Sequence, residues 1–542
     1  MRIAIALLAA ALLALAASST PAAAHPQNAG AAEADAATSS RAVAPDITNP
    51  GPCTAAAAEG MPEGDGHNHQ DIEQHRNLRC GMEQAAFLPL KEELKDRPDV
   101  VLGEMDVKAD IAAVSVIYPE GGVLFFDVSD PANPKFLSWY RDANCESVAF
   151  ANNCGAFVDL SADGKTAIIG VQNLSFAPNP FEIDTEGRPT AQPGVQVVDI
   201  SDPTKPRRGF NRTVVSLGGV HTARTFTVAD GPAKGEYVYA IANGVGVDIS
   251  RFVPAPGGGR MLVSVNQIDA PGLHDTFTQV DPIDGKTYLY IADGFSSGFQ
   301  VFDVTDPTVD KRVARWDLTP ECSRDWYAHT IDVTHRGNKR YVTLPAELFT
   351  SGTQRESEQQ LGCGKVGGNG DKAGPMWIVD ASDFSKLPQA GQPTGETKKK
   401  SEAALVATWS NPAGRAAGNL TFSPHNQQIV GDKIYLSDYH GGVFVLDASG
   451  AFAGRSERPR ELAYMVPAGD ASNEAARPLF TPPPGSATPR MRGRSNIWDM
   501  VFYKGYVLAA DQVGGFYSLQ YEGDAPAQRG PAPGRPAASG QP

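Results

Sequence analysis

The sequence predicts an all-β fold, a seven-bladed β-propeller with an N-terminal signal peptide and flexible termini. Three observations support this prediction. A short apolar strand that ends in Asp recurs along the chain, a second strand introduced by a turn dipeptide precedes most copies, and four histidines share one position in successive copies. β repeats at a fixed period are typical of propellers, in which each repeat forms one blade.

The recurring strand is a run of bulky apolar residues closed by Asp. Such residues favour a buried strand, whereas Asp and a following Pro end it through a side-chain hydrogen bond and a fixed φ. The clear copies span 122–127, 195–199, 299–303, 376–380 and 443–447, and degenerate copies span 246–250 and 515–520. Roughly 60 residues per unit fits four-stranded blades with long loops.

A preceding strand and its turn predict a hairpin in most copies. The turn dipeptides are Asp163-Gly164, Asp284-Gly285, Gly431-Asp432 and Lys504-Gly505. A Gly-containing two-residue connection between alternating runs is a strong hairpin signal. The last blade lacks one strand, so we expect an N-terminal segment, either 85–90 or 100–104, to complete it. No long helix is expected, and the basic run 398–400 is assigned to a solvated loop.

The N-terminus has the composition of a signal peptide. An apolar run over 3–17 follows Arg2, and small residues at 22–24 provide an Ala-x-Ala cleavage site. This run is too short for a stable membrane anchor. We therefore expect a secreted, periplasmic or cell-surface protein without a membrane span. The predicted segments are a signal peptide (1–24), an Ala-rich linker with a Cys/His-containing pre-propeller segment (25–97), the propeller (98–523) and a disordered tail (524–542).

The cysteines and the charge are consistent with export. Six cysteines are an even number, which in an oxidising compartment favours disulfides. The formal net charge of −15 argues against nucleic acid or an anionic membrane as a partner. Proximity in sequence and in blade topology selects the pairs. The predicted disulfides join Cys53 to Cys80, Cys145 to Cys154, and Cys322 to Cys363.

The histidines at the shared position are candidate metal ligands. They are His221, His274, His329 and His425. Each lies just before the first strand of its copy, and the first strands of propeller blades surround the axis, so these imidazoles are expected to converge. Imidazole suits Fe, Cu and Zn, and an all-histidine site leaves the metal charge uncompensated, which favours Lewis-acid or O₂ chemistry. Asp275 and Asp499, close to the same position, are candidates for further ligands or outer partners.

Other interpretations of these histidines stay open. Repeat copies inherit residues from one another, and a histidine at a strand start can simply bridge neighbouring blades by hydrogen bonds. The channel can also bind a ligand without a metal. A second candidate metal cluster, His67, His69 and His75, lies in the pre-propeller segment.

The longest insertions are expected on the face where the four histidines begin their strands. They span 141–156, 173–193, 347–374 and 469–495. Function in a rigid scaffold usually lies on such loops, so an unknown small molecule, protein or surface glycan is the expected partner at this face.

The strand 194–199 (Gly-Val-Gln-Val-Val-Asp) and endings such as 127–131 (Asp-Val-Ser-Asp-Pro) resemble the LVIVD repeat family of exported bacterial β-propellers. The resemblance covers residues 98–523 and implies the fold, not an activity. Two function classes follow. We favour a binding or scaffold protein with a histidine-lined axial site, because no nucleophile or general acid/base pair emerges. The alternative is a metal-dependent oxidoreductase or lyase acting on a small molecule in the channel, so whether the chain is an enzyme stays open.

Overall fold

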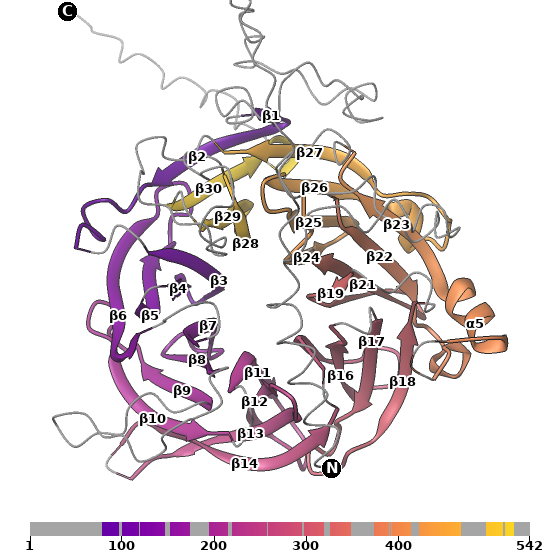
Figure 1. Ribbon diagram of the computed structural model, residues 1–542, viewed down its shortest axis with the longest axis horizontal. Coiled ribbons are helices and arrows are strands. Elements are labelled where there is room, and N and C mark those ends of the chain that lie inside the picture. The colour runs from indigo at the N-terminus through magenta and orange to yellow at the C-terminus, as the bar shows by residue number, and fades with distance from the viewer. Residues whose placement is uncertain are drawn as a thin grey trace, which may run out of the picture. The chain divides into compact units, whose positions relative to one another are not determined.

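The computed structural model describes residues 78–96, 100–118, 120–146, 152–173, 194–214, 219–256, 258–270, 272–294, 298–318, 326–347, 373–389, 391, 393–412, 422–467, 495–512 and 515–524. The chain divides into two compact units, 1–45 and 46–542, and all described residues lie in the second. Its seven antiparallel sheets follow one another around a central axis (Figure 1). The predicted seven-bladed, all-β propeller is therefore confirmed.

The first four blades each run from the axis to the rim in chain order. Blade one is β3 (Val101–Lys108), β4 (Ile111–Tyr118), β5 (Glu120–Asp127) and β6 (Lys135–Glu146); blade two is β7 (Asn152–Leu160), β8 (Thr166–Asn173), β9 (Gly194–Asp199) and β10 (Arg207–Thr213); blade three is β11 (Val220–Val228), β12 (Gly235–Ala242), β13 (Gly246–Pro254) and β14 (Arg260–Asp269); blade four is β15 (Asp275–Val280), β16 (Thr287–Ala292), β17 (Gly298–Asp303) and β18 (Arg312–Asp317).

The remaining blades follow the same pattern. Blade five is β20 (Asp332–Arg336), β21 (Lys339–Glu347), β22 (Pro375–Asp380) and β23 (Leu405–Ser410), with β19 (Tyr327–Ala328) also paired to β21; blade six is β24 (Gln427–Val430), β25 (Lys433–Ser437), β26 (Val443–Asp447) and β27 (Arg460–Val466); blade seven is β28 (Ile497–Tyr503), β29 (Tyr506–Asp511) and β30 (Gly515–Tyr521), completed by β2 (Met82–Leu88).

The N-terminal strand β2 closes the ring. It pairs antiparallel with β30, so the candidate at 85–90 overlaps the closing strand, whereas 100–104 begins the innermost strand of blade one. Between blades one and seven, the rings of Phe126 and Phe516 stack with their centroids 4.4 Å apart. The rim strand of the last blade thus comes from a part of the chain that precedes residue 98.

A further strand before β2 extends blade six. β1 (Leu78–Cys80) pairs with β27 as its fifth strand. Cys80, at the end of β1, is disulfide-bonded. Its predicted partner, Cys53, lies outside the described residues, so that pairing stays a prediction.

The Asp that ends each recurring strand holds the turn after it. In five blades its Oδ1 accepts the backbone N–H of the residue two positions on, at 2.9–3.2 Å. These pairs are Asp127 with Ser129, Asp199 with Ser201, Asp303 with Thr305, Asp380 with Ser382, and Asp447 with Ser449. This side-chain turn is the physical basis of the repeat signature.

The core is distributed between the blades. Seven hydrophobic clusters of the described residues each combine side chains from two neighbouring blades. Only short helices occur in this part of the chain, among them α5 (Glu396–Ala404) and α6 (Ser449–Phe452). The basic run 398–400 lies on α5, so its assignment to a loop is wrong. Lys, Glu and Ala have high helix propensity, and this segment is rich in them.

Inner-strand carboxylates tie consecutive blades together near the axis. Each of four aspartates accepts a backbone N–H from the innermost strand of the next blade, at 2.6–2.8 Å. They are Asp106 (from Leu160), Asp159 (from Thr225), Asp332 (from Ile429) and Asp499 (from Met105). A buried N–H without an acceptor is costly, so these side chains fix the spacing of the blades at the centre.

Replacing Asp332 by alanine tests this role. Asp332 also accepts the N–H of Val333, at 2.7 Å, so the substitution leaves two amides without acceptors. We expect the free energy of unfolding, measured by urea denaturation, to fall by about 2 kcal/mol. The exposed turn residue Asp306 is the matched control, and its change to alanine is expected to cost about 0.5 kcal/mol. Equal losses for the two variants would contradict the inter-blade role.

Candidate metal centre

The structure brings the four repeat histidines together on the axis. His221 is in β11, and the other three lie at or just before the innermost strands of blades four, five and six. Consecutive ring centroids are 4.4 Å (His221 to His274), 4.1 Å (His274 to His329) and 3.6 Å (His329 to His425) apart. Imidazoles that are far apart in sequence therefore form one stack around the centre.

The chain enters two of these positions through a glycine with a left-handed backbone. Gly219 and Gly272 each lie two residues before a histidine, with φ of 69° and 92°. Side chains other than glycine rarely adopt this conformation. The turn at each glycine lets the chain enter the blade with the histidine at the axis.

Every Nδ1 of the cluster is hydrogen-bonded to an oxygen atom. His274 Nδ1 bonds the carbonyl of His329 (3.0 Å), His329 Nδ1 bonds that of His425 (3.1 Å), and His425 Nδ1 bonds that of Trp498 (2.7 Å). His221 Nδ1 lies 2.9 Å from the side-chain oxygen of Gln172. A carbonyl oxygen only accepts, so each Nδ1 is the donor and each Nε2 keeps its lone pair. Within the described residues, each of these imidazoles bonds to a neighbouring blade through its Nδ1.

Two of the Nε2 atoms lie close to a buried carboxyl group, that of Glu347 at the end of β21. Its oxygens are 3.6 Å from His329 Nε2 and 3.9 Å from His425 Nε2. Candidate ligand atoms of His274, His329 and Glu347 all lie within 4.8 Å of one another, as do those of His329, His425 and Glu104. His425 Nε2 is buried, and none of the described residues hydrogen-bonds to it. Imidazole nitrogens and carboxyl oxygens at this spacing can together act as ligands of a cation.

Burial keeps the imidazoles neutral and the carboxyl groups protonated in the metal-free protein. It lowers the pKa of His221 to about 3 and that of His274 to about 4, and it lowers the pKa of His329 and His425 well below the usual range. It raises the pKa of Glu347 to about 8, against a hydrogen bond from Tyr439. Neutral imidazole is the form that binds metals.

Aromatic side chains enclose the cluster. Tyr439 donates a hydrogen bond to Glu347 and stacks on Trp498, with ring centroids 5.2 Å apart. Trp498 occupies the histidine position in blade seven, and its ring centroid is 4.2 Å from that of His425. Tyr439 has a φ of 38°, a conformation that a residue with a bulky side chain adopts only when its surroundings impose it.

The two predicted aspartates accept hydrogen bonds from groups other than the imidazoles, and their part in metal binding stays a prediction. Asp499 accepts backbone N–H groups from Met105 and Met500, at 2.6 and 2.7 Å. It also shares a hydrogen bond with Glu104, whose pKa burial raises and the Asp499 charge raises further. Asp275 accepts two hydrogen bonds from Arg224, at 2.9 and 2.7 Å. Asp499 is thus linked through Glu104 to the group that contains His329 and His425.

Sequence reasoning missed Glu347 and Glu104. Glu347 ends the second strand of blade five, where other blades carry Asp293, Asp438 and Asp511. Those aspartates accept hydrogen bonds from other segments, for example Asp438 from the side-chain N–H of Asn411, at 2.6 Å, and Asp511 from the backbone N–H of Asn496, at 3.1 Å. The longer side chain at the same strand exit was the available signal, because the Glu347 carboxyl group lies within 4 Å of two of the histidines.

Several predicted residues fall outside the described part of the chain. His67, His69, His75, Cys53, Cys322 and Cys363 are among them. Cys145 and Cys154 lie in β6 and β7, in stretches whose side chains are not described. The second metal cluster and these disulfides stay predictions.

These observations define a seven-bladed propeller with a buried histidine and carboxylate cluster on its axis. The LVIVD repeat model matches residues 191–211, which contain β9 and the Ser-Asp-Pro turn after it, so the chain carries an LVIVD repeat as the resemblance implied. No curated protein matches the chain.

Solved structures resemble the chain at low identity. The periplasmic gluconolactonase PpgL of Pseudomonas aeruginosa is 13% identical, with a TM-score of 0.41, over 67% of this chain and 85% of that protein. A protein from Lactobacillus plantarum is 10% identical, with a TM-score of 0.38, over 64% and 80%. The propeller domain of Myceliophteria thermophila Cps50 (Swd1) is 9% identical, with a TM-score of 0.40, over 77% and 95%. We draw no functional argument from these similarities.

Proposed function

We propose that this protein is an exported propeller that binds one divalent transition metal ion, Fe, Cu or Zn, on its axis. The ligands are the Nε2 atoms of His221, His274, His329 and His425. The observation that carries the proposal is the use of every Nδ1 as a donor to an oxygen atom, which leaves the Nε2 lone pair of each clustered imidazole available for a metal. Metal-binding histidines typically have this second hydrogen bond, which fixes tautomer and ring orientation.

Glu347 compensates part of the metal charge. It is the carboxylate closest to two of the Nε2 atoms, and Tyr439 orients it. Four neutral nitrogen donors and one carboxylate suit a borderline transition metal better than Ca²⁺ or Mg²⁺, which prefer oxygen ligands. Glu104, whose oxygens accept hydrogen bonds from Asn426 and Trp498, forms an outer carboxyl pair with Asp499.

The favoured biological role is binding or scaffolding in the periplasm, at the cell surface or outside the cell. The N-terminal sequence predicts a signal peptide and so supports export, and no helix in the described ranges is both long and apolar enough to cross a membrane. The insertions around the histidine face are then the expected contact surface for a small molecule, a protein or a surface glycan.

One observation favours a metal-dependent oxidoreductase or lyase as the second candidate. The four histidines come from only four of the seven blades, blades three to six, and the ionisable side chains of Glu347 and Tyr439 lie beside them. A metal there would supply Lewis-acid or O₂ chemistry. Glu347 and the Tyr439 hydroxyl would hold and move a proton beside it.

Elemental analysis of the purified mature protein tests the metal site. We expect about one Fe, Cu or Zn per chain after export into a metal-replete medium, and a fall in thermal stability when a chelator removes it. His335 is not part of the cluster and provides a control. Its Nε2 lies 3.1 Å from an oxygen of Asp281, and His335→Ala is expected to keep the metal. A metal-free protein whose stability does not respond to added Zn²⁺ or Cu²⁺ would remove the proposal.

A further inference from the structure

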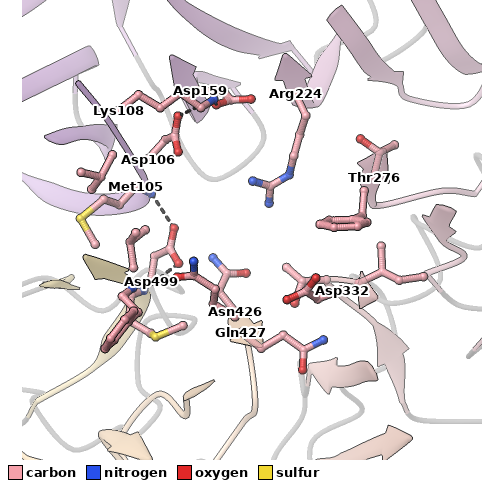
Figure 2. Close-up of a pocket in the computed structure, with 18 of the residues that line it drawn as sticks. Met105, Asp106, Lys108, Asp159, Arg224, Thr276, Asp332, Asn426, Gln427 and Asp499 are labelled. Atoms are coloured by element: carbon pink, nitrogen blue, oxygen red, sulfur yellow. Dashed lines mark hydrogen bonds and ion pairs between the residues drawn. The ribbon is translucent and has the colours of Figure 1, made fainter. Parts of the chain in front are cut away.

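A separate cavity of about 440 Å³ lies on the axis beside the histidine layer. The innermost strands of all seven blades line it (Figure 2). Thr330 and Asn426, the residues after His329 and His425, belong to its wall, whereas none of the four histidines does. Small-molecule sites in proteins typically measure roughly 300–1,000 Å³, so this cavity is large enough for a ligand of its own.

Arg224 supplies an unused donor to this cavity. Its guanidinium points into the open centre of the ring of side chains (Figure 2). Nε and Nη2 are engaged by Asp275, at 2.9 and 2.7 Å, whereas none of the described residues accepts a hydrogen bond from Nη1. Asp275 and the ring of Phe157, 4.5 Å from the guanidinium carbon, hold the side chain in place. A rigid, pre-positioned donor of this kind recognises an oxygen acceptor on a ligand.

The charge of the wall disfavours an anion as that ligand. The wall carries four carboxylates, Asp106, Asp159, Asp332 and Asp499, against two cations, Lys108 and Arg224. Lys108 is committed to Asp106 and Asp159, at 3.0 and 2.6 Å. A negatively charged ligand would therefore meet unbalanced like charge, which is unfavourable in a partly buried site.

The wall instead matches a neutral molecule with several hydroxyl groups. Carboxylate and amide oxygens, including those of Asp332 and Gln427, accept hydrogen bonds from hydroxyls, and Thr225 and Lys108 belong to the same wall. Phe277 and Phe502 are half-buried and contribute apolar faces. The electron-rich face of an aromatic ring attracts the polarised C–H groups of such a molecule.

We propose that this cavity binds a neutral polyhydroxylated molecule of monosaccharide size, with an oxygen of the ligand accepting from Nη1 of Arg224. The site is distinct from the metal centre and does not depend on it. It adds a small-molecule ligand of defined chemistry to a propeller whose proposed function rests on metal binding.

Calorimetric titration of the full mature protein in EDTA tests the proposal without the metal. The probes are D-glucose, D-mannose and myo-inositol, with D-gluconate as the anionic counterpart of D-glucose. We expect saturable binding of at least one neutral probe at one site per chain. D-Gluconate is expected to bind at least about tenfold more weakly, because the cavity wall has no surplus cation to compensate its negative charge. No saturable binding of any neutral probe, or tighter binding of D-gluconate, would overturn the assignment.

Two variants locate the site. Arg224→Lys keeps the ion pair with Asp275 but removes the guanidinium fork, and it is expected to weaken binding of the neutral probe by at least about tenfold. Thr278→Phe fills part of the cavity and is expected to abolish binding. Arg207→Lys, in the exposed pair of Arg207 with Asp199, is the matched control and is expected to bind normally. Thermal unfolding of each variant checks its folding.

The outcome separates this proposal from the metal proposal. Arg224→Lys is expected to retain the metal, and His274→Ala/His329→Ala is expected to retain binding of the neutral probe. Unchanged binding in both Arg224→Lys and Thr278→Phe would place the probe elsewhere and overturn the inference, whatever the metal content.

Discussion

Replacing His274 and His329 together by alanine is expected to abolish stoichiometric metal binding. The two imidazoles are central in the stack, and His329 belongs to both groups of ligand atoms that lie within 4.8 Å of one another. Loss of an outer partner of a metal ligand typically weakens binding about 10–100-fold, so loss of two direct ligands is expected to exceed about 100-fold. Elemental analysis and competition with a chromogenic chelator measure the effect.

The same variant is expected to lose the stability that the metal confers. A ligand that binds only the folded protein adds about 2.7 kcal/mol at a free concentration of 100 times its Kd. Wild-type protein should therefore unfold at higher temperature when metal is added, whereas the double variant should not respond.

Loss of inter-blade hydrogen bonds alone must be separated from loss of ligands. Thr330→Val is the matched control, because the Thr330 hydroxyl donates to the carbonyl of His425, at 2.8 Å, as His329 Nδ1 does. This variant should lose about 1 kcal/mol of stability and keep the metal. If the double variant retained one metal per chain, the histidines would be inter-blade bridges only, and the metal proposal would fail.

The fold could be predicted because its signals are local and repeated. The Asp at the end of each recurring strand forms its turn within two residues, so the sequence pattern and the structure report the same contact, as at Asp127 and Ser129. Ring closure was harder to predict, because β2 and β30 are far apart in sequence and share no motif. Two N-terminal candidates fitted the missing strand equally well, and only pairing in three dimensions separated them.

The site could be predicted only in part. The repeat placed the four histidines at equivalent positions, and equivalent positions in a closed ring converge. Glu347 and Tyr439 were not predictable in this way, because their roles depend on a single blade each. Glu347 is longer than the Asp found at the same strand exit in other blades, and Tyr439 reaches it from blade six through an unusual backbone conformation. The sequence repeat predicts only residues that the blades have in common, whereas the axial site also contains residues that occur in a single blade.

Metal affinity is expected to depend on pH through Glu347 rather than through the histidines. In the metal-free protein burial raises the pKa of Glu347 to about 8, so below that pH metal must displace its proton. The histidines are already neutral, because burial lowers the pKa of His221 to about 3 and that of His274 to about 4, with His329 and His425 shifted in the same direction. They release no protons near neutral pH.

The expected result is an affinity that falls about tenfold per unit as the pH drops below about 8, and does not fall more steeply near 6.5, where ordinary imidazoles titrate. Calorimetry in buffers of different ionisation enthalpy should count about one proton released per metal at neutral pH. Glu347→Gln is expected to bind more weakly and to show no pH dependence between about pH 6 and about pH 8. Glu104→Gln is the matched carboxyl variant, and it reports any proton released from the pair with Asp499. If the metal affinity fell more steeply below about pH 6.5, the imidazoles would be protonated there. That result would contradict the lowered pKa values of the buried histidines.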